Sequence, residues 1–285
     1  MKKGFFIARR GDSPFKRILI HVILIICCII AIYPVTRIFS VSLRPGDRLL
    51  TTDLRIIPED ATWDNYKRVI FSSNFILWLW NSILITITTS IVGVILATSA
   101  GYAFSRFRFP GHRSGLLFIL ATQMIPASML LLPLYIMLVR LKLINSYLGL
   151  IIAYSVTALP FTIWILKGYF DTVPPELEEA ARVDGATHLG AFYKIIIPLS
   201  TPALAIAALF NFTTAWNEYL VARVIIQRAE LYTWTLGLFE FQGQFNTQWG
   251  LYNAASILIS IPILILFLYS AKWLVSGLTL GAVKG

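Results

Sequence analysis

Long apolar stretches separated by short polar segments dominate the chain. A helix needs about 20 apolar residues to cross the hydrocarbon core of a bilayer. Six stretches approach this length: 18–40, 76–104, 114–139, 149–168, 200–222 and 251–275. The strands of a membrane β-barrel would alternate with a period of two, whereas these stretches are continuously apolar. The pattern therefore predicts an all-α membrane protein with six transmembrane helices, forming one domain over residues 18–275.

The composition supports a membrane protein. The 285 residues are 57% hydrophobic and 13% charged, and the mean hydropathy is +0.74. A soluble domain usually carries about 25% charged residues. Most side chains are therefore expected to face the lipid bilayer, where charged groups are unfavourable.

The net charge of +10 raises the question of a nucleic-acid partner, but the placement of the charges argues against one. Six basic residues precede the first apolar stretch, opposed only by Asp12: Lys2, Lys3, Arg9, Arg10, Lys16 and Arg17. Such a cluster is typical of an end that stays in the cytoplasm. Residues 1–17 are therefore predicted to be cytoplasmic, and six spans place the tail 276–285 on the same side.

The segment 171–199 does not have the pattern of a simple loop. Pro174 and Pro175 suit the first turn of a helix. Gly185 is placed to end that helix with a positive φ, and a second helical piece over 186–196 runs to Pro198. Two helices this short cannot cross a bilayer, so we expect them to lie on the cytoplasmic face. Their surface suits docking of another protein, and an amphipathic helix in the lipid interface is the alternative.

The residues of this segment resemble a known motif. Glu179-Ala180-Ala181, followed by Gly185 and by Ile195-x-Ile197-Pro198, is similar to the EAA loop of binding-protein-dependent ABC importers, which has Leu at the position of Ile197. The resemblance implies that residues 171–199 form the helix that couples the permease to a cytoplasmic ATPase. The coupling residues it implies are Glu179, Ala180, Ala181, Asp184, Gly185 and Pro198.

Further stretches resemble the carbohydrate branch of this family, and most closely its MalG-like maltose/maltodextrin permeases. They are residues 77–82, 101–111, 164–170 and 277–285. The resemblance implies the MetI-like permease fold, and translocation of maltose, maltodextrin or a similar oligosaccharide delivered by a periplasmic or lipid-anchored solute-binding protein. It also implies a MalF-like second permease subunit, a dimer of ABC ATPase subunits, and a place in the cytoplasmic (inner) membrane of a bacterium or archaeon.

Glycines at 277, 281 and 285 leave a thin, flexible strand at the C-terminus. The resemblance implies that this tail reaches into the ATPase dimer, with Gly281, Lys284 and Gly285 as contacts. The spacing of Gly277 and Gly281 would also fit a small-residue motif for helix packing, which is the alternative.

Polar side chains at membrane depth are functional hypotheses by default. We therefore propose a solute path along Asn81, Gln123, Asn211, Trp216, Asn217 and Glu218. Aromatic faces and neutral hydrogen-bonding groups suit a sugar. Glu218 lies near the outer end of its predicted span, so an ordinary interfacial carboxylate is the alternative there.

Enzymatic function is not expected. The chain has no Gly-x-x-x-x-Gly-Lys-Ser/Thr phosphate loop, and its three histidines are scattered without metal-ligand spacing. We expect no catalytic residue, metal or cofactor in this chain, with ATP and Mg²⁺ used by the partner ATPase. A secondary transporter would need coupling carboxylates at mid-membrane depth, which only Glu218 approaches. An ABC permease for another solute, such as glycerol phosphate, is the nearest alternative.

Overall fold

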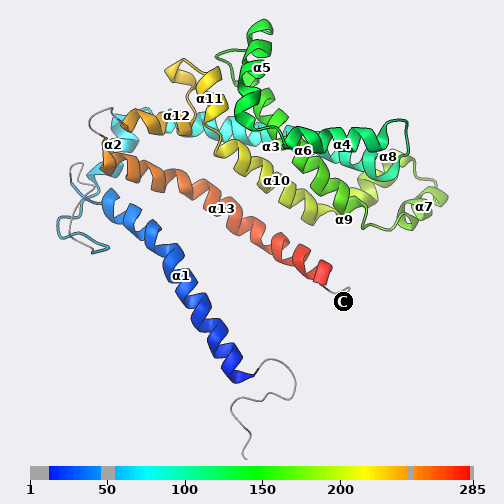
Figure 1. Cartoon of the computed structure of the whole chain (residues 1–285), viewed down its shortest axis with the longest axis horizontal. Coiled ribbons are helices and arrows are strands. Elements are labelled where there is room, and N and C mark those ends of the chain that lie inside the picture. The colour runs from blue at the N-terminus through cyan, green and yellow to red at the C-terminus, as the bar shows by residue number, and fades with distance from the viewer. Residues whose placement is uncertain (1–12, 46–54, 243–246, 283–285) are drawn as a thin grey trace, which may run out of the picture. The chain divides into compact units, whose positions relative to one another are not determined.

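The computed structural model describes residues 13–45, 55–242 and 247–282, and all regular elements within these ranges are helical (Figure 1). The predicted all-α fold is thereby confirmed. The elements are α1 (Pro14–Ser42), α2 (Asp64–Ser72), α3 (Phe75–Arg106), α4 (His112–Gln123), α5 (Ala127–Arg140), α6 (Tyr147–Phe170), α7 (Glu176–Val183), α8 (His188–Ala191), η1 (Phe192–Ile196), α9 (Ile197–Leu199), α10 (Thr201–Trp216), α11 (Leu220–Ile225), η2 (Ala229–Leu231), α12 (Trp234–Leu238), η3 (Phe239–Phe241) and α13 (Trp249–Ala282).

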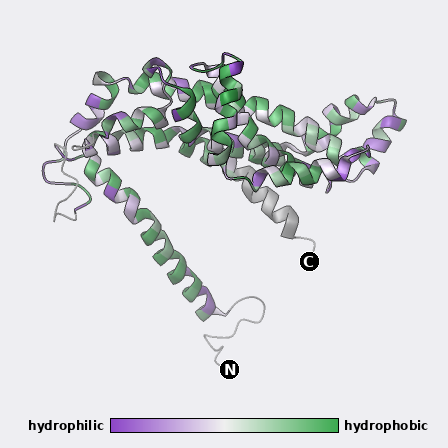
Figure 2. Cartoon of the chain, turned by 45° about the horizontal axis from the view of Figure 1, so that its top comes forward, coloured by the Kyte–Doolittle hydropathy of each residue, from purple (hydrophilic) through white to green (hydrophobic). Residues whose placement is uncertain are grey.

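Four of these helices are long and apolar enough to cross a bilayer, namely α1, α3, α6 and α13. The number rises to six if each of two bent helix pairs is one span. Figure 2 shows the apolar character of α1 along its length, and its residues from Phe15 to Val35 are exposed. Exposed apolar side chains on a helix of this length fit a lipid environment.

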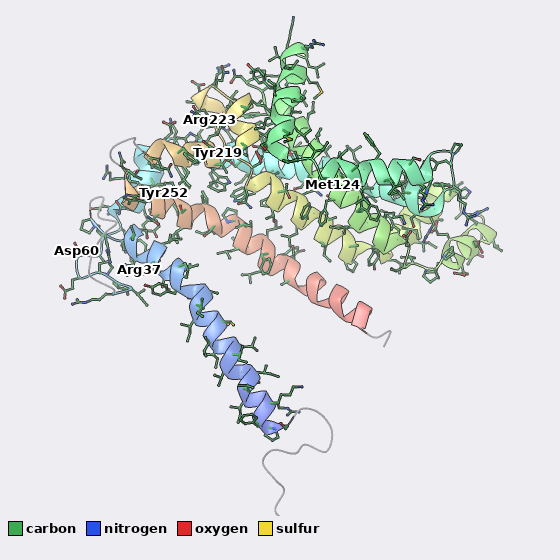
Figure 3. All side chains as sticks on the ribbon, viewed as in Figure 1. Arg37, Asp60, Met124, Tyr219, Arg223 and Tyr252 are labelled. Atoms are coloured by element: carbon green, nitrogen blue, oxygen red, sulfur yellow. The ribbon has the colours of Figure 1, made fainter. Side chains whose placement is uncertain are left out.

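Two predicted spans differ from the observed helices. The stretch 114–139 is not one helix. The chain bends by 104° between α4 and α5, near Met124, which Figure 3 labels. Pro126 caps α5 with φ −56° and ψ 131°, an extended conformation that no helix can continue through. The predicted span 200–222 is also too long, since α10 ends at Trp216.

The chain divides into two compact units, the first with residues 1–73 and 241–258 and the second with 74–240 and 259–285. In the first unit, α2 holds the end of α1. Asn65 donates from Nδ2 to the carbonyls of Ser42 (3.0 Å) and Arg44 (2.8 Å), and the hydroxyls of Ser42 and Tyr66 lie 2.7 Å apart. The bond to the Ser42 carbonyl satisfies one of the carbonyl groups that a helix end leaves unpaired.

The second unit is built on α3, α6 and α10, which pack together as its core (Figure 1). One apolar cluster, including Ile85, Tyr154 and Ile225, lies toward the α11 end of these helices. Another, including Tyr102, Phe170 and Phe192, lies toward the α7 end. The three helices therefore form a continuous body that joins the two ends of the unit.

Asn211 of α10 lies fully buried between these clusters. Its Nδ2 donates to Thr162 Oγ1 of α6 (2.9 Å) and to the Ala207 carbonyl (2.8 Å). Gly93 of α3 makes room for this amide, because a Cβ there would lie 2.7 Å from Asn211 Oδ1. The close approach of α3 and α10 therefore depends on a missing side chain.

We predict that Gly93→Ala destabilises the protein, because the added methyl group overlaps the Asn211 amide. Overpacking of this kind costs about 1–3 kcal/mol. Gly168→Ala in α6 is the matched control, since a Cβ there meets no atom within 4 Å and alanine favours a helix by up to about 1 kcal/mol. Thermal unfolding of the purified protein should show a lower midpoint for Gly93→Ala only; equal midpoints would contradict the prediction.

Candidate functional site

The predicted coupling segment, residues 171–199, begins with the amphipathic helix α7. Three acidic residues occupy its first turn, Glu176, Glu178 and Glu179, where they complement the positive end of the helix dipole. Gly185 follows with φ +87°, so the predicted positive φ is confirmed. The Ala186 and Gly185 N–H groups donate to the carbonyls of Ala181 (2.9 Å) and Arg182 (3.0 Å), which is the Schellman pattern of a helix end.

The second piece of the segment differs from the prediction at both ends. The Thr187 hydroxyl accepts from the Gly190 N–H (3.0 Å) and starts α8 at His188, after which the π-helical turn η1 and α9 continue to Leu199. Pro198 therefore lies inside the helical piece and does not end it. The direction changes at Ser200, where the chain bends by 77° into α10.

Glu178 fixes α7 to the last turn of α3. Its carboxylate forms an ion pair with Arg106 Nε, and Tyr102 Oη donates to its Oε2 at 2.6 Å. Both charged side chains are largely buried, with 13% of Arg106 and 11% of Glu178 exposed. Removing one partner of such a pair leaves a buried charge and costs about 3–5 kcal/mol. Glu178 is therefore a structural anchor, and the sequence pattern did not single it out.

The remaining nitrogens of Arg106 extend this anchor. Nη2 donates to the Val173 carbonyl at 2.8 Å, and Nη1 donates to Ser105 Oγ at 3.2 Å. Ser105 in turn donates to Asp171 Oδ1 (2.7 Å), and Lys167 Nζ of α6 lies 2.5 Å from Asp171 Oδ2. The start of the coupling segment is thus bound to the ends of both α3 and α6.

Glu179, the residue next to Glu178, is exposed. Glu179, Ala180, Asp184 and Gly185 are exposed, whereas Ala181 is buried. Large apolar side chains are exposed in the same segment: Leu177, Val183, Leu189 and Tyr193, with Val183 at 87%. Figure 2 shows polar residues concentrated around α7 as well. A mixed face with exposed large apolar groups is the kind of surface that binds another protein.

Three residues of the predicted solute path, Asn81, Asn211 and Trp216, are buried. Asn81 is buried, and its amide bonds the carbonyls of Glu230 and Tyr232 (both 2.9 Å) and the Tyr147 hydroxyl (2.8 Å). Asn211 is enclosed in the helix core, and Trp216 is buried against Phe212 and Trp234. That these three residues line a solute path stays a prediction, because the contacts described for them are with other residues of the protein.

The other three path residues are more accessible. Asn217 is exposed, and Glu218 caps α11 by accepting from the Val221 N–H at 2.6 Å. Glu218 lies beyond the end of α10, where burial raises the pKa of its carboxyl, opposed by the N–H groups of Val221 and Leu220. Gln123 is exposed and lines a hollow of about 440 Å³ between α4, α5 and α6, which Thr122 and Thr157 also line.

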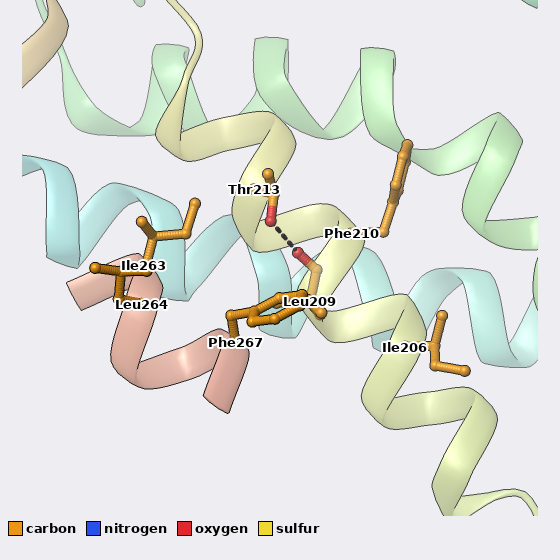
Figure 4. A pocket seen from close by; sticks show the side chains of 7 residues that line it. All are labelled: Ile206, Leu209, Phe210, Thr213, Ile263, Leu264 and Phe267. Atoms are coloured by element: carbon orange, nitrogen blue, oxygen red, sulfur yellow. Dashed lines mark hydrogen bonds between the residues drawn. The ribbon is translucent and has the colours of Figure 1, made fainter. Parts of the chain in front are cut away.

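A second hollow, of about 460 Å³, lies between α10 and α13 (Figure 4). Its lining is Ile206, Leu209, Phe210, Thr213, Ile263, Leu264 and Phe267. The Thr213 hydroxyl donates to the Leu209 carbonyl at 2.7 Å, so its proton is unavailable to a ligand. This hollow is lined by apolar side chains and one threonine, whereas the lining of the other hollow also contains the Gln123 amide.

The predicted C-terminal tail differs from the expected thin strand. Helix α13 continues to Ala282, so Gly277 and Gly281 are helical. The proposed contacts Lys284 and Gly285 lie outside the described residues.

Comparisons with known proteins agree with this architecture. Residues 90–279 match the family described as binding-protein-dependent transport system inner membrane component. The chain is 36% identical to the diacetylchitobiose uptake system permease protein DasC of Streptomyces coelicolor, covering 96% of this chain and 99% of that one. It is 35% identical to the maltose/maltodextrin permease MalG of Escherichia coli K12, covering 93% and 95%. A bacterial ABC transporter involved in alginate import has a chain with a TM-score of 0.80 and 26% identity, covering 93% and 99%.

Proposed function

Since the chain belongs to the family of binding-protein-dependent transport system inner membrane components, we propose that it is the permease subunit of an ATP-driven importer of oligosaccharides. The observation that carries the proposal is the coupling segment. Its two short helices turn at Gly185 and are anchored to α3 through Glu178, while Glu179, Val183 and Leu189 remain exposed. Such a rigidly held, exposed pair suits docking in a separate subunit.

The docking partner is proposed to be a dimer of cytoplasmic ATPase subunits. Glu179 is an exposed residue in the first turn of α7, and it would pair with a basic side chain of the ATPase. The ATPase would bind ATP and Mg²⁺ and supply the energy, so this chain would carry out no hydrolysis itself. In this scheme residues 171–199, the N-terminus and the C-terminal tail would lie in the cytoplasm, with Gly281, Lys284 and Gly285 as further ATPase contacts.

The solute is proposed to be an oligosaccharide, because relatives at 35–36% identity are permeases for diacetylchitobiose, maltose/maltodextrin and galactooligosaccharides. A solute-binding protein would deliver it to a path between this chain and a MalF-like second permease. The hollow beside Gln123, whose lining contains the amide of that residue, is the part of this chain best suited to line that path. The hydroxyls of Thr122 and Thr157 in the same lining donate to the Ile119 and Tyr154 carbonyls, so they could only accept hydrogen bonds from a sugar. Asn217 and Glu218 would face the outer end.

Reconstitution tests this proposal. The chain, its second permease, the ATPase and the binding protein are placed in proteoliposomes, and uptake of labelled maltotriose, diacetylchitobiose, galactotriose and glycerol 3-phosphate is measured. We expect uptake of one oligosaccharide that requires both ATP and the binding protein. Uptake driven by a proton gradient without ATP would overturn the proposal in favour of a secondary transporter, and uptake of glycerol 3-phosphate alone would overturn the sugar assignment.

A further inference from the structure

Helix α3 is anchored by side chains at both of its ends. At the α7 end, Tyr102 and Arg106 hold Glu178 of the coupling segment. At the other end, Asn81 donates to the carbonyls of Glu230 and Tyr232, and Ser82 Oγ accepts from the Trp234 N–H at 2.7 Å. The segment 229–238, which contains η2 and α12, is therefore also fixed to α3.

The helix between these two anchors is suited to transmit displacement. It runs for 32 residues, Phe75–Arg106, without a proline. The other long helices α1, α6 and α13 each contain one, namely Pro34, Pro160 and Pro262. Proline is the usual cause of a sharp kink. From Asn81 to Arg106, at 1.5 Å per residue, α3 covers about 38 Å.

Each anchor uses its hydrogen-bonding groups almost completely. Both carboxylate oxygens of Glu178 are occupied, one by Arg106 and one by Tyr102, and the Tyr102 ring packs 4.5 Å from the Phe192 ring. Arg106 also bonds Val173 and Ser105. A fully satisfied buried network is rigid, so a movement of α7 has to carry the end of α3 with it.

We propose that α3 is the element that couples ATPase-driven movement of α7 to the outer segment 229–238, with Glu178, Arg106 and Tyr102 as positioning residues. This inference rests on the proposed function. Glu178 does not contact the ATPase in this scheme, in contrast to the adjacent Glu179. It converts displacement of the docked helix into displacement of α3, and Asn81 delivers that displacement at the far end.

The first test separates coupling from assembly. Glu178→Gln keeps the size of the side chain but removes the negative charge that Arg106 faces. Arg106→Lys keeps the positive charge but loses the guanidinium nitrogen that donates to the Val173 carbonyl. Glu176→Gln is the matched control, an exposed position in the same helix turn. We expect both variants, but not the control, to lower the stimulation of ATP hydrolysis by the loaded binding protein by roughly 2- to 30-fold. Stimulation is expressed relative to the basal rate of the same purified complex, so that a loss of bound ATPase is not counted as a loss of coupling.

The second test reads out the far end of α3. Ala229 is exposed and small, and Ala229→Cys in a Cys27→Ser/Cys28→Ser background gives one site for a membrane-impermeant maleimide. In the assembled complex, ATP with vanadate should change the labelling rate, and Glu178→Gln should abolish that change. An unaltered nucleotide response in Glu178→Gln, or stimulation equal to that of Glu176→Gln, would overturn the inference. Failure of the parent complex to take up solute with ATP would overturn the proposed function instead.

Discussion

Replacing Gly185 with valine is expected to abolish ATP-driven uptake while leaving membrane insertion unchanged. The backbone at Gly185 has φ +87°, a conformation that costs a residue with a side chain about 1–2 kcal/mol and is least tolerated by β-branched ones. Valine would straighten the turn between α7 and α8 and break the two bonds that end α7. The docking face would then lose its shape.

A graded series makes this prediction specific to backbone conformation. Asparagine tolerates the left-handed region better than other residues with side chains, so Gly185→Asn should retain much of the uptake that Gly185→Val loses. A Cβ at this position meets no atom of this chain within 4 Å, so the first side-chain atom causes no clash and the strain lies in the backbone. The measurements are uptake in proteoliposomes and co-purification of the ATPase. Wild-type uptake by the Gly185→Val variant would refute both the prediction and the coupling role of the turn.

The second large effect is expected at Gly237 in α12. A Cβ on this residue would overlap the indole ring of the buried Trp78 on α3, so Gly237→Ala should displace α12 from α3. Overpacking typically costs about 1–3 kcal/mol. We expect a lower unfolding midpoint and weaker stimulation of the ATPase by the binding protein.

A double-mutant cycle with Trp78→Ala identifies the contact. Once the ring is absent, Gly237→Ala should add little further destabilisation, although Trp78→Ala is itself costly. Unfolding midpoints of the four proteins supply the comparison. Additive effects of the two substitutions would show that the glycine is required for a reason other than the indole ring.

The spanning helices were predictable from the sequence because hydropathy alone decides which segments enter lipid. The bend between α4 and α5 was not, because the polar residues near it, Thr122, Gln123 and Ser128, are too few to interrupt the apolar stretch 114–139. Proline did not signal it either: Pro126 lies at the bend, whereas Pro133 lies inside α5. Both prolines lie within the same apolar stretch, so the presence of a proline does not by itself say where a helix ends.

The candidate site was predictable to the level of its backbone. The positive φ of Gly185 followed from its position after an amphipathic helix. The division of labour between Glu178 and Glu179 did not follow, because two adjacent glutamates look alike in a sequence. Their difference arises from Tyr102 and Arg106, more than 70 residues away, and only the fold brings these residues together. The role of Asn81 was not predictable for the same reason. It is a polar residue within an apolar stretch, and the carbonyls of Glu230 and Tyr232 that it binds are distant in the sequence.

The anchoring of Glu178 has a consequence for engineered hybrids of these permeases. Residues 171–199 look like a self-contained cassette that could be transplanted between relatives to redirect a permease to a different ATPase. Its buried carboxylate, however, is matched to an arginine and a tyrosine that the cassette does not contain. A hybrid that exchanges only residues 171–199 is therefore compatible with a recipient only if that recipient has Tyr and Arg at the positions of Tyr102 and Arg106. A working hybrid would otherwise have to exchange two distant stretches together, residues 171–199 and the end of α3 that contains Tyr102 and Arg106.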